Sequence, residues 1–329
     1  MWRAFGTGLS KALVIAVIAL QSATLICAAT ARAEYPERPI RLIVPFGPGG
    51  PADILARVVG VRLSERLGKP VVIENQSGAS TIVGTQQAAK SSADGYTLVV
   101  FSLTHAANAA SGRPLPYDSL KDFTPVAMLG ASPFMLVVNP AMPKTLGELV
   151  TKAKSGAPLV VSTAGVGSST HLTAELFSLM SGANISTIPY RGSGPALADL
   201  MTGVVEMSFS SVVSALPYTK SDRLRGLAVT SSQRSKAVPD LPTLAESGFP
   251  GFDSTSWIAV FAPAGTPAPI VGRLNSEISA VMDLPDVRQT LDNDGSDVLK
   301  MSPEELGRYF SAEVAKWRDV IVKGQIKFE

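Results

Sequence analysis

Two loops rich in glycine and hydroxyl residues carry the groups of this sequence best suited to bind an anion. The first is residues 47–53, Gly-Pro-Gly-Gly-Pro-Ala-Asp, and the second is residues 163–170, Thr-Ala-Gly-Val-Gly-Ser-Ser-Thr. Apolar residues at helical spacing follow each loop, so each leads into the start of a helix. The first N–H groups of a helix lack intrahelical partners and, with the helix dipole, form an anion site. We therefore expect unpaired donors at Ala52, Asp53 and Ile54, and the same kind of donors plus four hydroxyls in the second loop.

Each loop has a simpler explanation when taken alone. Glycine before a helix is common in tight connections between a strand and a helix, and Asp53 is equally able to cap its own helix. Together the loops are more informative, because two such helix starts can hold an anion from opposite sides of a cleft. On this interpretation, Ser168→Ala should weaken binding and leave the melting temperature of the ligand-free protein nearly unchanged.

The two histidines are not expected to form a catalytic or metal centre. His171 opens the helix after the second loop, but a catalytic base needs a nucleophile and an orienting acid, and the sequence has no G-x-S-x-G motif. We expect His171 to pack and hydrogen-bond near the helix start, and His105 to have a structural or rim role. Two distant histidines and no cysteine beyond Cys27 predict no metal site.

Two further motifs are interpreted as ordinary connections. Residues 292–297, Asp-Asn-Asp-Gly-Ser-Asp, lack the glycine at the sixth position and the distal glutamate of a calcium-binding EF-hand, so we expect an acidic surface turn. Gly165 and Gly167 begin a dinucleotide fingerprint, but Thr170 replaces its third glycine. No cofactor is therefore predicted.

Short apolar strands alternate with helical patterns along the chain. Strands are predicted at residues 40–44, 71–73, 97–101, 159–163, 185–190 and 225–230, and helices at 54–67, 82–90, 171–180, up to 201, 270–282, 285–291 and 303–322. This order predicts parallel sheets covered by helices. Two similar α/β units, one around each glycine loop, suggest two lobes.

The N-terminus has the three parts of a secretory signal peptide. Arg3 and Lys11 are followed by an apolar run at 12–26 and by Ala-Arg-Ala at 31–33. A membrane-spanning helix needs about 20 apolar residues, so this run is short for an anchor. We expect residues 1–33 to be cleaved near Ala33 and the mature protein to reside in the periplasm.

The predicted cleavage changes the net charge and the cysteine content of the protein. The 329 residues are 46% hydrophobic and 17% charged, which excludes a disordered chain, and the net charge is +2. Loss of three basic residues leaves 26 Lys and Arg against 27 Asp and Glu, a net charge of −1, and removes the only cysteine. Basic and acidic residues are interspersed, so no nucleic-acid partner is predicted. An anionic ligand must then be attracted locally.

Eight segments, in this order and spacing, resemble the solute-binding proteins of tripartite tricarboxylate transporters, the Bug family. They are YPERPI at 35–40, VPFGPGGPAD at 44–53, ENQSGA at 74–79, DGYTL at 94–98, GSSTHL at 167–172, PYRGSGPA at 189–196, LPTLAESG at 241–248, and Trp257 with APAGTP at 262–267.

The resemblance implies a two-lobed α/β periplasmic binding protein fold of type II. Each lobe is expected to be a mostly parallel sheet flanked by helices, with two crossing hinge strands, and the lobes close on the ligand. By this resemblance, residues 34–130 and 257–329 form lobe 1 and residues 131–256 form lobe 2. The stretch with Trp257 and Phe261 returns to the first lobe, so these side chains should pack at the hinge.

The resemblance also implies a receptor and not an enzyme. Known members hold a carboxylate mainly through backbone N–H groups and waters of the two loops, not through an arginine, and they deliver the ligand to membrane permease subunits. We expect a monomer that binds a small organic (di)carboxylate or related ligand. The expected ligand-binding residues are Phe46, Gly47, Pro48, Gly49, Ala52, Asp53, Ser80, Thr163, Gly167, Ser168 and Ser169, with Thr104, His105, His171 and Tyr190 at the rim.

Two departures from the family pattern leave the ligand's identity open. Ser80, Thr81 and Ile82 stand where the family usually continues with Gly-Ala-Gly-Gly-Asn, and Ala52 replaces a frequent threonine. Phe46 is either a wall of the ligand site or a core plug beneath the loop. Two other functions stay open: an exported α/β hydrolase or isomerase using a serine and His171, and a sensor that presents its closed form to a signalling partner.

Overall fold

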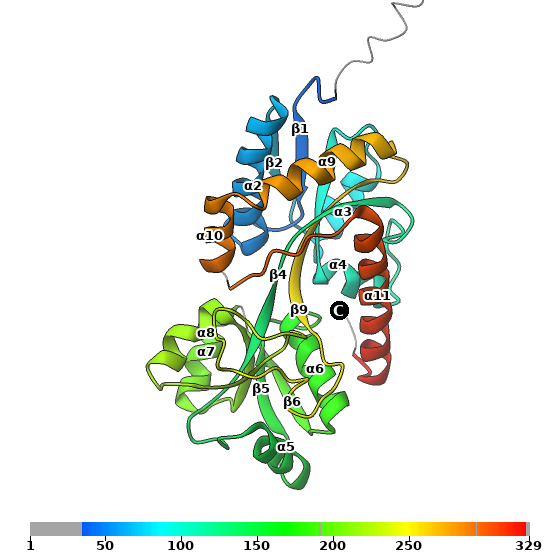
Figure 1. Ribbon diagram of the computed structural model, residues 1–329. Helices are drawn as coiled ribbons and strands as arrows, with labels where there is room; N and C mark the ends of the chain where they lie inside the picture. The colour runs from blue at the N-terminus through cyan, green and yellow to red at the C-terminus, as the bar shows by residue number, and fades with distance from the viewer. Residues whose placement is uncertain (1–34, 191, 294, 327–329) are drawn as a thin grey trace, which may run out of the picture. The chain divides into compact units, whose positions relative to one another are not determined.

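The computed structural model describes residues 35–190, 192–293 and 295–326 (Figure 1). The predicted signal peptide, residues 1–33, lies outside this range. A short N-terminal unit ends at Glu37, and a compact unit extends from Arg38 to the C-terminus; the fold given below is that of the second unit. Within the described ranges, no helix combines the length and the apolar character needed to cross a bilayer.

Strands and helices alternate along most of the chain. The strands are β1 (Ile40–Val44), β2 (Val71–Asn75), β3 (Thr97–Ser102), β4 (Phe123–Val138), β5 (Leu159–Thr163), β6 (Ile185–Pro189), β7 (Met207–Ser211), β8 (Arg225–Val229) and β9 (Thr255–Pro263). The helices are α2 (Pro51–Leu67), α3 (Ile82–Ala89), α4 (Leu103–Ala110), α5 (Leu146–Ser155), α6 (Ser169–Ser181), α7 (Ser193–Thr202), α8 (Val212–Lys220), α9 (Ala268–Val281), α10 (Pro285–Asn293) and α11 (Pro303–Lys323).

Two groups of parallel strands are joined by a long antiparallel pair. The strand order is β2-β1-β3-β9-β4-β7-β5-β6, with β8 also paired to β4. β1 is parallel to β2 and β3, and β5 is parallel to β6 and β7. Figure 1 shows β4 and β9 running together between the two groups. They are the two crossing strands that the family resemblance implies, and the α/β two-lobed fold is confirmed.

The strand β4 changes partner along its length. From Phe123 to Pro133 it pairs with β9, and from Phe134 to Val138 it pairs with β7. Its register against β9 shifts twice, between 125 and 127 and between 128 and 130. One continuous strand therefore belongs to both sheets, and the bulges bend it before it enters the second sheet.

Most predicted elements are confirmed, two of them with the same bounds. The strands predicted at 40–44 and 159–163 are β1 and β5 with the same bounds. Proline stands in the first turn of α9, α10 and α11, where a helical N–H needs no intrahelical partner. The sequence did not predict the positions of β4, β7 and β9.

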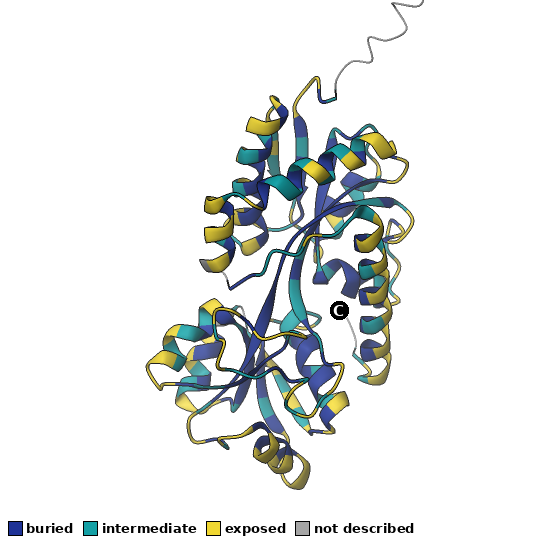
Figure 2. Cartoon of the chain, viewed as in Figure 1, coloured by how far each residue is buried: buried dark blue, intermediate teal, exposed yellow. Residues whose placement is uncertain are grey.

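A buried carboxylate joins β9 to the last helix. Trp257 of β9 and Trp317 of α11 are fully buried, and each indole N–H donates to the same Oε2 of Glu313 at 3.0 Å. Lys316 pairs with the other carboxylate oxygen and also donates to the main-chain oxygen of Asp253. Figure 2 shows the buried positions following β4 and β9, with exposed residues on the outer faces of the helices.

Candidate functional site

The first glycine loop connects β1 to α2 and is shorter than expected. α2 begins at Pro51 with Gly50 as its N-cap residue, and the N–H of Ile54 donates to the oxygen of Gly50 at 2.9 Å. The expected free donor at Ile54 is therefore wrong, because the helix starts one residue before Ala52 and Ile54 already takes part in its hydrogen bonding.

Asp53 lies beneath this loop and fixes its shape. The residue is 3% exposed. Its Oδ2 accepts hydrogen bonds from the Gly49 N–H at 2.8 Å and from Arg57 Nε at 3.0 Å, and its Oδ1 accepts from Asn75 Nδ2 at 2.9 Å. These donors, Arg57 first, outweigh burial and lower the pKa of Asp53 to about 2. Asp53 is thus a carboxylate that organises the loop, and the Gly49 N–H is already in use.

The second glycine loop connects β5 to α6 and is held by its own side chains. Ser168 is the N-cap residue, and its Oγ accepts from the His171 N–H at 3.3 Å. Thr170 Oγ1 accepts from the Ala164 N–H at 2.9 Å, and His171 Nδ1 accepts from the Gly167 N–H at 3.0 Å. His171 therefore packs and hydrogen-bonds near the helix start, as predicted.

Because Ser168 caps α6, replacing it affects the stability of the ligand-free protein. Replacing an N-cap serine by alanine costs about 0.5–2 kcal/mol of stability. Ser168→Ala should thus lower the melting temperature of the ligand-free protein, contrary to the sequence-based expectation.

Residues of both loops line a cavity of about 360 Å³, called here the loop cavity. The predicted residues that line it are Phe46, Gly47, Ser80, Thr104, Gly167 and Ser168. Sequence reasoning missed four polar residues of its wall, Ser77, Thr81, Asn108 and Arg113. The Arg113 guanidinium donates to Asn108 Oδ1 at 2.5 Å, so a positive charge lies in this wall.

The connection between β2 and α3, which lines the loop cavity with Ser80 and Thr81, has an unusual backbone conformation. Ala79, Ser80 and Thr81 have φ of 44°, 52° and 80°, a left-handed conformation that favours glycine. The amide of Asn108 supports it by donating to the oxygen of Ser80 at 2.7 Å and to Thr81 Oγ1 at 3.3 Å. The glycines that the family usually has here adopt this conformation readily. In this chain residues 79–81 carry side chains, and the buried Asn108 side chain stabilises the conformation.

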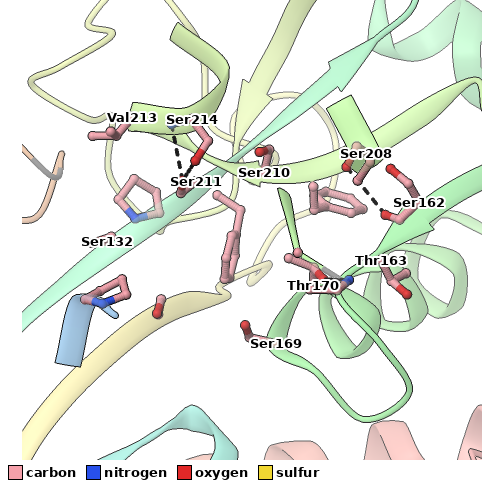
Figure 3. Close-up of a pocket in the computed structure, with 18 of the residues that line it drawn as sticks. Ser132, Ser162, Thr163, Ser169, Thr170, Ser208, Ser210, Ser211, Val213 and Ser214 are labelled. Atoms are coloured by element: carbon pink, nitrogen blue, oxygen red, sulfur yellow. Dashed lines mark hydrogen bonds between the residues drawn. The ribbon is translucent and has the colours of Figure 1, made fainter. Parts of the chain in front are cut away.

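A second cavity of about 410 Å³, called here the serine cavity, adjoins the loop cavity at Ala164, which lines both. Its wall comes from β4, β5, β7 and β9 and from the starts of α2, α6, α7 and α8 (Figure 3). Its hydroxyl residues are Ser132, Ser162, Thr163, Ser169, Thr170, Ser208, Ser210, Ser211, Ser214 and Ser256. None of the described residues that form this wall is charged. Thr163 and Ser169 are the predicted site residues found here.

The remaining predicted residues of the first loop lie outside these two walls. Pro48 and Gly49 are exposed on the loop, and Ala52 and Asp53 are buried below it.

Phe46 is partly buried, lines the loop cavity and places its ring edge against His105, with ring centroids 6.1 Å apart.

His105 has a structural environment. It is 1% exposed and its ring stacks on Phe101 at 4.2 Å. Nδ1 accepts from the Ser102 N–H at 3.0 Å, and Nε2 lies 3.1 Å from the hydroxyl of Thr85. Burial lowers the pKa of His105 to about 3, so the ring is neutral and caps α4.

Tyr190, also predicted at the rim, anchors the chain before α7. Its hydroxyl donates to Asp199 Oδ2 at 2.7 Å, and this bond raises the pKa of Tyr190 to about 12. A phenol committed to a carboxylate in this way is a poor proton donor or acceptor for a ligand.

The arrangement suits binding more than chemistry. Among the described residues the two cavities offer hydroxyls, main-chain groups at helix starts and the Arg113 guanidinium, a set that recognises oxygen-rich small molecules. Within the part of the chain that the structure describes, no group of three His, Cys, Asp or Glu side chains is placed to hold a metal ion.

Solved structures with this fold include binding proteins of the periplasm. The periplasmic binding protein BugD is 30% identical, covers 90% of this chain and 100% of its own, and superposes with a TM-score of 0.72. The Rhodopseudomonas palustris protein Rpa4515, solved with adipate, is 36% identical over 89% of this chain and 99% of its own, with a TM-score of 0.75. The fold and its two loops thus define a periplasmic solute-binding protein.

The family follows from the sequence comparison. Residues 55–326 match TctC, the tripartite tricarboxylate transporter family receptor. BugT of Bordetella pertussis is 39% identical over 315 residues, which are 94% of this chain and 96% of BugT. This chain belongs to the TctC family, whose members are the substrate-binding receptors of these transporters, and it is a receptor and not a hydrolase or isomerase.

Proposed function

We propose that this receptor binds a small carboxylate between its two glycine loops and delivers it to the permease subunits of a tripartite tricarboxylate-type transporter. The observation that carries the proposal is the loop cavity. Phe46 and Gly47 from the first loop face Gly167 and Ser168 from the second across one hollow. The similar protein Rpa4515 was solved with the dicarboxylate adipate, which supports a carboxylate as the ligand here.

The binding groups are main-chain donors, hydroxyls and the Arg113 guanidinium. The N-terminal ends of α2 and α6 add their dipoles, which favour a negative charge. The net charge of −1 expected after removal of residues 1–33 provides no long-range attraction. Recognition of the carboxylate is therefore local, at the two loops.

Closure around the ligand explains why both loops are needed. We assign residues 34–130 and 257–329 to lobe 1 and residues 131–256 to lobe 2. β4 and β9 form the hinge. Contacts to both loops form only when the lobes close, so a ligand shifts the population toward the closed form, and the permease recognises that form.

The route to the periplasm is the predicted signal peptide. Residues 1–33 direct export and are removed near Ala33, leaving a mature protein that acts as a monomer. Mass spectrometry of protein isolated from the periplasm would locate the new N-terminus, and an N-terminus at residue 1 would contradict this assignment.

The test of the function is a thermal-shift and calorimetry screen of residues 34–329 against mono-, di- and tricarboxylates. A ligand at 100 times its Kd adds about 2.7 kcal/mol of stability. Thr104→Val removes the hydroxyl of a residue that lines the loop cavity and is not the α4 cap, and we expect about tenfold weaker binding. The matched control, Ser311→Ala on the exposed face of α11, should bind as the wild type does. If no carboxylate raises the melting temperature, the proposed function is wrong.

A further inference from the structure

Serines occupy a face of the second sheet that is otherwise apolar. Along β5 and β7, Ser162 pairs in register with Ser208, and Ser210 lies two residues further along β7 on the same face. Ser210 is opposite Met135 of β4, which packs in the apolar cluster formed with α7 and α8. The alternation of side chains therefore places three hydroxyls where the rest of this layer has aliphatic side chains.

Two of these hydroxyls are buried without a partner. Ser162 is 1% exposed and Ser210 is 4% exposed, and neither Oγ has a hydrogen-bond partner among the described residues. Ser208 Oγ donates to the main-chain oxygen of Ser162 at 3.4 Å, a long bond (Figure 3). All three residues line the serine cavity. A buried hydroxyl with no partner is unfavourable in the protein alone, so this arrangement indicates a polar ligand group that completes it.

The charge around the two cavities indicates what kind of polar group this is. Arg113 lines the loop cavity, whereas the described wall of the serine cavity has no charged side chain. Among the described residues of that wall a buried carboxylate would find no cationic partner, and it would be repelled by a first carboxylate at the loops. Serine hydroxyls both donate and accept, so they match ligand hydroxyls, and the same wall includes apolar residues such as Pro133, Ala196 and Val213 for the carbon chain.

We propose that the serine cavity binds the uncharged, hydroxyl-bearing end of a monocarboxylate whose carboxylate lies at the glycine loops. This inference rests on the proposed function and narrows it to a substrate class, the polyhydroxy monocarboxylates. It distinguishes this chain from a receptor for simple dicarboxylates.

The test compares four six-carbon probes by calorimetry on residues 34–329. Gluconate and galactonate carry a hydroxyl on every carbon beyond the carboxylate, hexanoate carries none, and adipate ends in a second carboxylate. We expect the better of the two sugar acids to bind at least tenfold more tightly than hexanoate and adipate.

Variants locate the effect in the cavity. Ser162→Ala and Ser210→Ala should each weaken binding of the sugar acid about tenfold and leave hexanoate binding unchanged. Their ligand-free melting temperatures should equal or exceed that of the wild type, because each change removes a buried hydroxyl without a partner. A purely structural hydroxyl would instead lower the melting temperature. The control Ser311→Ala should change neither property.

Each result decides between the proposals. Sugar acids that bind no better than hexanoate overturn the inference, and so does adipate as the tightest of the four, which would assign a second carboxylate to the serine cavity. In both cases a carboxylate still binds and the proposed function stands. If none of the four probes binds, and the broader carboxylate screen is also negative, the proposed function and this inference both fail.

Discussion

Removing the charge of Asp53 tests how the first loop is held. Asp53→Asn keeps the size of the side chain and one oxygen that can accept the Gly49 N–H. It removes the negative charge that Arg57 and Asn75 also contact. We expect lower stability at neutral pH and weaker carboxylate binding, since the loop that lines the cavity is less well fixed.

The magnitude follows from the pKa of Asp53. Its value of about 2 lies below the ordinary 3.8, and each pKa unit corresponds to about 1.4 kcal/mol, which gives a ceiling of about 2.5 kcal/mol. Arg57 is 51% exposed, so solvent screens the pair, and we expect a loss of about 1–2.5 kcal/mol. Because the folded-state pKa is lowered, this stabilisation is fully present above about pH 5 and is lost as the pH falls toward 2.

Urea denaturation of wild type and variant at pH 7 and pH 3 measures this difference. At pH 3 the gap between the two proteins should shrink to about half of its value at pH 7. Asp319→Asn, which breaks an exposed ion pair with Lys323 on α11, is the matched control and should cost less than about 1 kcal/mol. An equal gap at both pH values would refute the reasoning, because it would mean that the charge of Asp53 does not stabilise the fold.

Two further predictions concern residues near the site and away from it. Folded His105 has a pKa of about 3 against about 6.5 when unfolded, so stability should fall by up to about 1.4 kcal/mol per pH unit below pH 6.5. His105→Gln should flatten that slope between pH 6.5 and 5 in urea denaturation, and parallel profiles for variant and wild type would contradict the assignment. A Cβ on Gly84 of α3 would lie 2.6 Å from the main-chain oxygen of Gln76, so Gly84→Ala should cost about 1–3 kcal/mol. Gly272→Ala in the exposed interior of α9 meets nothing within 4 Å and should stabilise by about 1 kcal/mol; thermal unfolding of both variants checks the pair, and equal effects would count against the packing argument.

The sequence predicted elements with a clear period and clear ends. β1 and β5 are short apolar strands that end in a glycine loop, and α11 begins at a serine cap followed by proline, so local chemistry defines them. β4 could not be predicted in the same way. It contains two prolines and a glycine, it is much longer than most strands, and its partner changes from β9 to β7 through contacts that are distant in sequence.

The candidate site, like the fold, could be predicted only where local sequence defines it. The glycine loops could be found because their residues are contiguous. The serines of β7 could not, since their meaning depends on which face of the sheet they occupy. The sequence did contain one indication of them: serine alternates with Met207 and Phe209, which places small polar residues on one face of β7. Arg113 was missed because only the fold brings it to the loop cavity.

Trp257 and Trp317 both donate to Glu313, and their fluorescence is sensitive to the surroundings of this carboxylate. The chain has three tryptophans, and the third, Trp2, precedes the predicted cleavage position. If residues 1–33 are removed as predicted, all indole emission comes from two fully buried rings that donate to one carboxylate, with one ring on strand β9 and the other on α11. Any ligand that moves the hinge strand against this helix changes the surroundings of both emitters together, so ligand binding can be followed by intrinsic fluorescence without a label.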